Sequence, residues 1–549
     1  MTGFMQSPCC SGTDFRGCRA VLTLDPPFLM YRLSMLVGVA AAAAVAAVGF
    51  RYGTYAAGGS DSSCYALMAD AFAGGALQPT SDLVSQVPWP DAPGTFTPGG
   101  FVVSEIHPGA SAPVCAPGFS VLLAPLAFAG GRDAVFFLTP IAGALLVWLT
   151  FVAARRMAGP LAGAMAAVLI SVSPPLLYQV VQPMNDVTTA ALWMAAFVAL
   201  IARRWALAGV CCGLALLVRP NLLPLALVSA LFVIVDRSVT RVAGPIPNPN
   251  PLIPRVAVFL AAVFPFGLLV LWLNSGLYGS PFRTGYGQLG NLFGLSALTT
   301  NAPRYVSWLV ETHTPFPLLA FAAPVVLPRE RRADGWLAIG FVLATCAIYF
   351  IYTPFDEWSY LRFLLPAIAL LLVLASAVTV TLLQYAPAPG RILAVAALAA
   401  AVAVFCVRSA TDRHAFTLRF LEQRYRSAGI VVRDRLPANA VVLSQWDSGA
   451  VRFHGRKEAL TWQGLDAAWL DRSLAWLDQH GRTPYILLES WEEPGFRSRF
   501  GNQSDIGKLD WPPRYEIDRV VRIYDPKDRS RYDRGEHINT EYLWPLRSP

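Results

Sequence analysis

Residues 160–202, PLAGAMAAVLISVSPPLLYQVVQPMNDVTTAALWMAAFVALIA, form two apolar runs separated by one short polar turn. The first run, 160–181, has about the length that a helix needs to cross roughly 30 Å of hydrocarbon, and 187–202 is shorter but similarly apolar. Asp186 stands in the turn between them. The pattern predicts two consecutive membrane spans with an acidic residue at their shared end.

The whole chain has the composition of a membrane protein. Of its 549 residues 55% are hydrophobic and 14% are charged, and the mean hydropathy is +0.47. These values exclude a soluble protein of this length. A net charge of +8 would suggest a nucleic-acid partner in a soluble protein, but here the arginines lie in the short turns between the apolar runs. We therefore expect a polytopic protein in the lipid bilayer, with no nucleic-acid partner.

The arginines also set the predicted topology. With a cytoplasmic N-terminus, the basic turns between the spans can all lie inside, provided that 117–131 is a juxtamembrane or re-entrant helix that does not cross. The odd number of spans then places the C-terminus outside. About eleven spans result: 33–50, 134–154, 160–181, 187–202, 205–218, 221–236, 256–274, 315–328, 334–353, 361–383 and 392–408.

Three regions follow from this topology. Residues 1–32 are predicted to be a disordered cytoplasmic leader, and a start at Met30 or Met35 would be equally reasonable. Residues 33–408 form an all-α membrane domain, whose first outer loop is 51–116. Residues 409–549 are richer in Arg, Asp, Glu and Trp, which indicates a small soluble α/β domain outside the membrane.

The first outer loop carries an acidic residue directly after the first span. Gly58, Gly59 and Ser60 break the chain, and an apolar helical pattern starts at Asp61. Asp61 and Asp186 would each be explained by helix capping if they stood alone. Their position on the same predicted side of the membrane favours chemistry there. Cys64 and Cys115 lie in the same loop and form either a disulfide or two free thiols.

Several motifs, taken in order, resemble the GT-C superfamily of polytopic glycosyltransferases, which use polyprenyl-phosphate-linked sugars. They are GGSDSSCYALMADAF (58–72), PGFSVLLAPL (117–126), FVAARRMAGPLAGA (151–164), SPPLLYQVVQPMND (173–186) and AGVCCGLALLVRPN (208–221). YGSPFRTGYG (278–287) and YLRFLLPA (360–367) are similar to the branch of lipopolysaccharide-core sugar transferases and protein O-mannosyltransferases. The resemblance covers about 33–408.

The resemblance implies roles for the two aspartates. An acceptor hydroxyl that attacks a sugar phosphate must lose a proton, and a nearby carboxylate is the natural general base. By resemblance this role falls to Asp61, while Asp186 positions the acceptor or the donor.

The leaving group of such a reaction is a lipid phosphate, which cationic side chains stabilise. The candidates are Arg219, Arg362 and Arg283, with His313 as a further contact to phosphate or sugar. Each arginine is explained equally well as an interfacial snorkelling side chain, and His313 as the start of a helix. Further substrate contacts are predicted from the outer loops, namely Glu105, His107, Tyr65 and Tyr360.

No cofactor or metal is predicted. The histidines form no ligand pair at helical spacing, and the first loop has no clear DxD motif. Asp61, Glu105 and Asp186 could in principle hold a divalent ion, but no pattern supports it.

The C-terminal region has the pattern of a small α/β unit. Residues 440–444 and 484–490 read as buried strands, and 465–481 as an amphipathic helix. Its tryptophans suit either a core or contact with sugar faces. SQWDSG (444–449) matches only part of the WWDYG motif of oligosaccharyltransferases, and no nucleotide-binding motif is present.

These features together predict an inverting membrane glycosyltransferase that transfers a hexosyl or pentosyl group. Its donor would be a polyprenyl-phosphate sugar, and its acceptor a hydroxyl of a glycan, glycolipid or protein, at the extracytoplasmic face of the plasma membrane. The alternative is a polytopic transporter or flippase, but the spans carry few charges and show no internal repeat.

Overall fold

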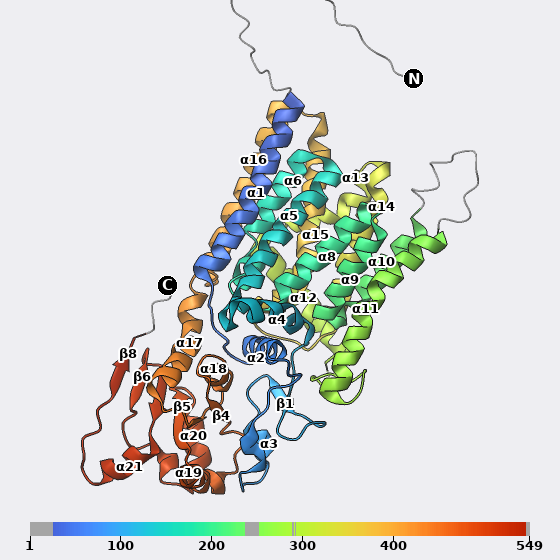
Figure 1. Ribbon diagram of the computed structural model, residues 1–549. Helices are drawn as coiled ribbons and strands as arrows, with labels where there is room; N and C mark the ends of the chain where they lie inside the picture. The colour runs from blue at the N-terminus through green and yellow to red at the C-terminus, as the bar shows by residue number, and fades with distance from the viewer. Residues whose placement is uncertain (1–25, 237–251, 288–289, 291, 545–549) are drawn as a thin grey trace, which may run out of the picture.

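The computed structural model describes residues 26–236, 252–287, 290 and 292–544. A helical bundle makes up the upper part of Figure 1, and a smaller domain with a sheet lies below it. The bundle contains α1 (Pro26–Tyr52), α5 (Leu138–Ala158), α6 (Pro160–Ser171), α7 (Pro174–Gln179), α8 (Asn185–Ile201), α9 (Trp205–Val218), α10 (Leu223–Val235), α11 (Leu252–Tyr278), α12 (Leu298–His313), α13 (Ala323–Val326), α14 (Arg332–Phe350), α15 (Leu365–Leu382) and α16 (Ala388–Asp412).

Helices occupy all eleven predicted spans. In the described part of the chain, six helical stretches are long and apolar enough to cross a membrane, and a pair bent by 114° between His313 and Phe316 would make seven. The remaining four predicted spans correspond to shorter apolar helices, α6, α8, α9 and the stretch Pro220–Val235. The chain is a multi-pass membrane protein. Residues 26–32 of the predicted leader belong to α1, while 1–25 lie outside the described residues.

The predicted span 160–181 is not one helix. It breaks after Ser171, and α7 begins at Pro174. Ser173 has φ −60° and ψ 120°, the extended conformation that a following proline imposes. Pro174 and Pro175 have no N–H to continue the ladder of α6. The break turns the chain before it reaches Asp186.

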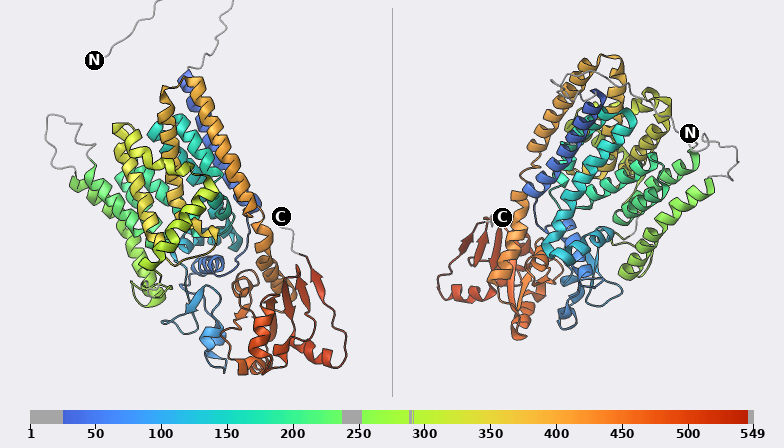
Figure 2. Two further views of the ribbon diagram at one scale, coloured as in Figure 1. Left: turned by 180° about the vertical axis from the view of Figure 1, so that it is seen from behind. Right: turned by 45° about the horizontal axis from the view of Figure 1, so that its top comes forward.

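Helix α15 is the centre of the bundle. The apolar window of its span is 100% buried, and it packs against α5, α6, α8 and α14. The corresponding windows of α1, α11 and α16 are only 11–22% buried, so these helices form the periphery that a bilayer would contact. The two views of Figure 2 show α1, α11 and α16 along the outer edges of the bundle.

Basic turns gather at the end of the bundle away from the sheet domain. Arg203, which follows α8, pairs with Asp236 at 3.0 Å and with Asp334 at 2.8 Å, and Arg331 pairs with Asp334 at 3.3 Å. Arg156 donates to the carbonyl of Val198, near the same end of α8. This clustering is the one that the arginine pattern predicts. The side of the membrane on which it lies stays a prediction.

The opposite end of the bundle is covered by two short helices. Figure 1 shows α2 (Asp61–Ala73) and α4 (Gly118–Gly130) lying across this end, between the bundle and the sheet domain. This orientation of α4 is the one expected of a juxtamembrane helix, and its position relative to the bilayer stays a prediction. A disulfide joins Cys64 to Cys115, so these two cysteines are not free thiols. The segment between α2 and α4 contains α3 (Ala92–Thr95) and the hairpin of β1 (Phe101–Val103) and β2 (Ser111–Pro113).

The C-terminal domain is a mixed sheet with helices, as the sequence predicts. Its six strands are ordered β4-β3-β5-β7-β6-β8, and β4, β3 and β5 run parallel. The elements are α17 (Leu418–Arg435), β3 (Ala440–Leu443), α18 (Ser448–Phe453), β4 (Glu458–Leu460), α19 (Leu470–Gln479), β5 (Thr483–Glu489), α20 (Glu493–Phe500), β6 (Tyr515–Ile517), β7 (Val521–Tyr524), α21 (Pro526–Asp533) and β8 (Glu541–Leu543).

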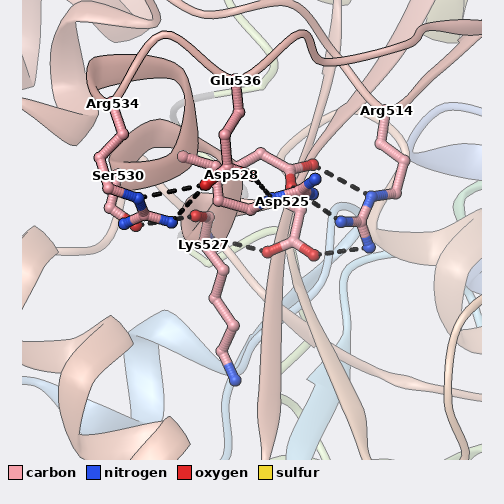
Figure 3. Close-up of polar contacts among 8 residues, drawn as sticks. Arg514, Asp525, Lys527, Asp528, Ser530, Arg534 and Glu536 are labelled. Atoms are coloured by element: carbon pink, nitrogen blue, oxygen red, sulfur yellow. Dashed lines mark hydrogen bonds and ion pairs between the residues drawn. The ribbon is translucent and has the colours of Figure 1, made fainter.

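Charged residues near the end of the chain stabilise this domain. Arg514, just before β6, pairs with Asp525 at 2.7 Å and with Asp528 at 2.9 Å (Figure 3). Glu536 accepts hydrogen bonds from Arg531 and Arg534. These contacts fix α21 against the sheet, so the high charge of this segment has a structural role.

The outer loop contributes to the core of the C-terminal domain. Trp89 and Phe96 belong to the same buried cluster as Leu443 and Leu474, and the Trp89 and Trp476 ring centroids are 5.8 Å apart. The backbone N–H of Thr461 donates to the carbonyl of Thr95 at 2.6 Å. The outer loop of the membrane domain and the C-terminal domain that begins at residue 409 therefore share one hydrophobic core.

Replacing Trp89 with alanine should destabilise the C-terminal domain by about 3–5 kcal/mol, because it empties a buried site and removes the indole donor to Thr95 Oγ1. Protease resistance of the purified protein in detergent would measure the loss. Trp544→Ala, at an exposed tryptophan, is the control and should change little. Equal protease resistance of the Trp89→Ala protein and the wild type would contradict the shared core.

Candidate functional site

Asp186 and Arg219 form a buried ion pair at the end of the bundle that faces the sheet domain. Asp186 lies in the first turn of α8 and its side chain is 0% exposed, while Arg219 directly follows α9. Arg219 Nη1 is 2.6 Å from Asp186 Oδ1. Helices α8 and α9 are consecutive and antiparallel, so these two ends meet. An acidic group at a helix N-terminus and a basic group at a C-terminus are both stabilised by the helix dipoles.

Arg362 joins the second aspartate to this pair. It lies in the 3-10 turn Trp358–Leu364, just before α15 begins. Its Nη2 is 3.3 Å from Asp61 Oδ2, and its Nε is 3.8 Å from Asp186 Oδ2. The four side chains form an alternating series, Asp61, Arg362, Asp186 and Arg219, whose formal charges sum to zero. The structure thus brings together four residues that the sequence singled out.

The two aspartates differ in accessibility. The side chain of Asp61 is 52% exposed, whereas that of Asp186 is fully buried. Neither is the N-cap residue of its helix, because Ser60 and Met184 occupy those positions. Asp61 is therefore the carboxylate that solvent reaches, and Asp186 is the one that pairs with both arginines.

Aromatic rings enclose the two arginines. The guanidinium carbon of Arg219 lies 4.9 Å from the ring centroid of Phe363, and that of Arg362 lies 5.3 Å from the same centroid. Tyr349 contacts Arg219 at 5.7 Å, and Tyr360 contacts Arg362 at 5.0 Å. Cation–π contacts of this kind stabilise cations in sites with little water. They leave the arginines few rotamers.

Asp61 is fixed to the arginine site through α2 and α4. The disulfide links Cys64, in the first turn of α2, to Cys115, three residues before α4. Gly118 then packs directly on the carbonyl of Leu217, where a Cβ atom would have no room. Leu217 is two residues before Arg219. A covalent bond and a close backbone contact therefore set the position of Asp61 relative to Arg219.

Two tyrosines lie near the charged series from the outer loops. Burial raises the pKa of the Tyr65 hydroxyl, and nearby Tyr286, Asp61 and Asp186 add to this shift. Burial and the nearby Asp61 also raise the pKa of Tyr286. Both hydroxyls therefore stay protonated and can donate hydrogen bonds. Tyr65 and Tyr360 were singled out from the sequence, but Tyr286 was not.

Four other predicted site residues lie apart from this series. Arg283 pairs with Glu105 at 2.6 Å on the exposed surface, and in the described part of the chain this pair contacts neither aspartate. His107 is exposed in the β1–β2 hairpin. His313 is fully buried, and its Nε2 and Nδ1 atoms lie 2.8 Å from Ser173 Oγ and from Thr312 Oγ1. Both ring nitrogens therefore have partners within the bundle, which is typical of a structural histidine.

Sequence reasoning missed the uncharged residues around the arginines. Phe363 contacts both guanidiniums, and Asn221 donates to the Tyr349 hydroxyl at 3.2 Å. Phe363 lies in the motif YLRFLLPA and Asn221 in AGVCCGLALLVRPN, each close to a candidate arginine. That proximity in the sequence could have identified both residues. Tyr349 lies in an apolar run, where no feature of the sequence indicates a role in this site.

The acidic groups of this site already have cationic partners. Asp186 faces two arginines and Asp61 faces one. Across the described ranges, no three His, Cys, Asp or Glu side chains are arranged to hold a metal ion.

Asp186→Asn should lower the stability of the protein by about 3–5 kcal/mol, because two buried arginines lose their shared counter-ion. Asp61→Asn should cost only about 0–1 kcal/mol, since its carboxylate is half-exposed. Thermal unfolding of both variants in detergent would compare them. An equal loss of melting temperature in the two variants would show that the carboxylates do not have these different roles.

Solved structures with the same fold include an archaeal oligosaccharyltransferase and a bacterial protein, ArnT. No protein-family model and no curated protein sequence matches the chain. The apo oligosaccharyltransferase of Archaeoglobus fulgidus aligns with a TM-score of 0.53 at 12% identity, over 87% of this chain and 73% of that one. ArnT from Cupriavidus metallidurans bound to undecaprenyl phosphate aligns with a TM-score of 0.52 at 13% identity, over 86% of this chain and 94% of that one. Apo ArnT gives 0.52 at 15% identity, over 90% and 97%. The chain therefore shares the fold of these solved membrane proteins.

Proposed function

We propose that the protein transfers a sugar from a polyprenyl-phosphate donor to an acceptor hydroxyl, at the end of the bundle where α2 and α4 lie. The observation that carries this proposal is the accessible carboxylate of Asp61 next to two buried arginines. The proposal is supported by the fold, because ArnT of the same fold has been solved with undecaprenyl phosphate. The donor lipid would enter from the bilayer around the bundle.

Arg219 and Arg362 would bind the phosphate of the donor. A polyprenyl-phosphate sugar carries one negative charge, and its phosphate gains a second when the sugar leaves. Two guanidiniums fixed by aromatic rings and by Asp186 can donate hydrogen bonds to that charge without first reorganising. Asp186 Oδ2 and Arg362 Nε are 3.8 Å apart and neither has a hydrogen-bond partner in the described chain. That Nε–H has no hydrogen bond to lose when a phosphate oxygen binds.

Asp61 would act as the general base. Its carboxylate takes the proton of the acceptor hydroxyl, and the acceptor oxygen forms a bond to the anomeric carbon. The bond from that carbon to the phosphate oxygen breaks, and its electron pair leaves with the lipid phosphate. Attack from the side opposite the leaving group inverts the anomeric configuration. Arg362, 3.3 Å from Asp61, keeps the base close to the phosphate site.

Asp186 would position the arginines and would not contact the substrate. Its side chain is fully buried and it lies between both guanidiniums. We propose that the acceptor is a glycan, glycolipid or protein outside the cytoplasm, with the bundle in the plasma membrane and the C-terminal domain on the outer side. The arginine pattern and the predicted span count support this orientation.

Asp61→Asn should lower the rate of sugar transfer by about 10²–10⁴-fold while binding of the donor persists, because only the proton acceptor is lost. Arg219→Met should weaken binding of the donor as well. Purified protein supplied with radiolabelled polyprenyl-phosphate sugars and a cell-envelope acceptor fraction would give both values.

Asp82→Asn is the matched control, since Asp82 is an exposed aspartate of the same outer loop, and it should transfer at the wild-type rate. Full transfer by Asp61→Asn would remove the proposed base. Passage of the intact donor across reconstituted vesicles without any sugar transfer would instead indicate a transporter or flippase.

A further inference from the structure

The parallel part of the C-terminal sheet has the geometry of a binding edge. Strand β3 is flanked by β4 and β5, both parallel to it. The chain leaves β3 toward β4 on one side and later returns to β5 on the other, so the strand order reverses between β3 and β5. In open sheets with parallel strands, ligands bind outside the carboxyl ends at such a reversal point. The two loops that leave β3 and β5 are therefore the ones to inspect.

Each of these two loops presents an exposed tryptophan. Trp446 follows β3 and is 45% exposed, and Trp491 follows β5 and is 54% exposed. Their ring centroids are 5.5 Å apart and their planes meet at 60°. By contrast, Trp462 and Trp511 are buried in the core of the domain. Adjacent exposed rings form one continuous apolar surface, and apolar surfaces rimmed by polar residues are typical of binding sites.

Polar contacts beneath the pair hold Trp491 in place. Its indole Nε1 donates to Glu489 Oε2 at 2.7 Å. The Nε of Arg424 donates to both oxygens of Glu489, at 3.0 and 3.1 Å. Glu492 accepts from the backbone N–H of Glu489 and from the indole of Trp462. The exposed ring is thus the surface of a rigid, hydrogen-bonded base.

Asp447 is a buried acid with no partner at this edge. It follows Trp446 directly, is 0% exposed, and neither carboxylate oxygen has a hydrogen-bond partner in the described chain. Burial raises its pKa, and nearby Glu489 and Glu492 raise it further. Burial also raises the pKa of Glu492 to about 7. Leaving a buried polar group unpaired costs about 1–3 kcal/mol, and a bound hydroxyl is one group that could pair with it.

This edge of the sheet faces Asp61. The backbone N–H of Gly99 donates to Ser448 Oγ at 3.0 Å, which joins the loop after β3 to the outer loop. Gly449 packs so closely on Ser63 that a Cβ atom would not fit there, and Ser63 is two residues from Asp61. Figure 1 shows α18, which begins at Ser448, next to α2. The loop that carries Trp446 therefore packs against α2, the helix that begins at Asp61.

We propose that Trp446 and Trp491, with Asp447 beneath them, bind a saccharide ring of the acceptor. Pyranose rings present C–H faces that pack on indole rings, and the acid Asp447 directly follows Trp446 in the sequence. The acceptor would then enter from the sheet domain while the donor phosphate sits at Arg219 and Arg362 on the membrane side. This inference rests on the proposed function and narrows its acceptor to a glycan or glycolipid.

The test compares Trp446→Ala, Trp491→Ala and Trp446→Tyr in the full-length protein. In the transfer assay the two alanine variants should raise the KM for the acceptor about tenfold and leave the KM for the donor unchanged. Trp446→Tyr should recover most of the loss because it keeps an aromatic face. Trp544→Ala, at an exposed tryptophan of the same domain, should behave as wild type. A change in the donor KM alone would overturn the proposal and assign the rings to the donor sugar.

A second measurement does not depend on catalysis. Saturation-transfer NMR of the purified protein with trisaccharides of α-mannose, β-glucose and α-glucose should show contact with at least one, and Trp491→Ala should abolish it. No contact with any of the three, or contact unchanged in the variant, overturns the saccharide site. If wild-type protein transfers no sugar but the NMR contact is present and lost in Trp491→Ala, the saccharide site stands and the proposed function fails.

Discussion

The buried carboxylate of Asp186 is the constraint on which this end of the molecule depends. It accepts from Arg219 at 2.6 Å and lies 3.8 Å from Arg362, so one negative charge holds two positive charges together. Without it, two guanidiniums that both face Phe363 would repel each other in a site with little water. The antiparallel helices α8 and α9 and the turn before α15 must meet for this arrangement to form. The bundle thus fixes two guanidiniums at this end of its helices.

The accessible acid is brought to that site by a separate set of contacts. The Cys64–Cys115 disulfide and the close packing of Gly118 on Leu217 place α2 over the ends of the bundle helices. The outer loop then continues into the core of the C-terminal domain through Trp89 and Phe96. Asp61 therefore lies between the arginines on one side and the carboxyl edge of the sheet on the other. In the proposed reaction, Asp61 would be held where a lipid-borne donor and an acceptor from solution meet.

Sequence reasoning found the fold because membrane spans are encoded locally, by length, apolarity and flanking arginines. The break at Ser173 escaped it, since hydropathy averages over two prolines that interrupt a helix. The shared core was missed because Trp89 and Trp476 are far apart in the chain. In the site, the order of the motifs singled out Asp61 and Asp186, and the need for cations at the outer ends of spans singled out Arg219 and Arg362. From side-chain chemistry alone, Arg283 was an equal candidate for the phosphate site. Its pairing with Glu105 depends on tertiary packing, which the sequence does not show.

The most direct test of this account is a structure of the purified protein bound to undecaprenyl phosphate, determined by electron cryomicroscopy. The account predicts phosphate density within about 3 Å of the guanidiniums of Arg219 and Arg362, with the carboxylate of Asp61 beside it. Phosphate density at Arg283, or at any position where Asp61 cannot reach the substrate, would contradict it.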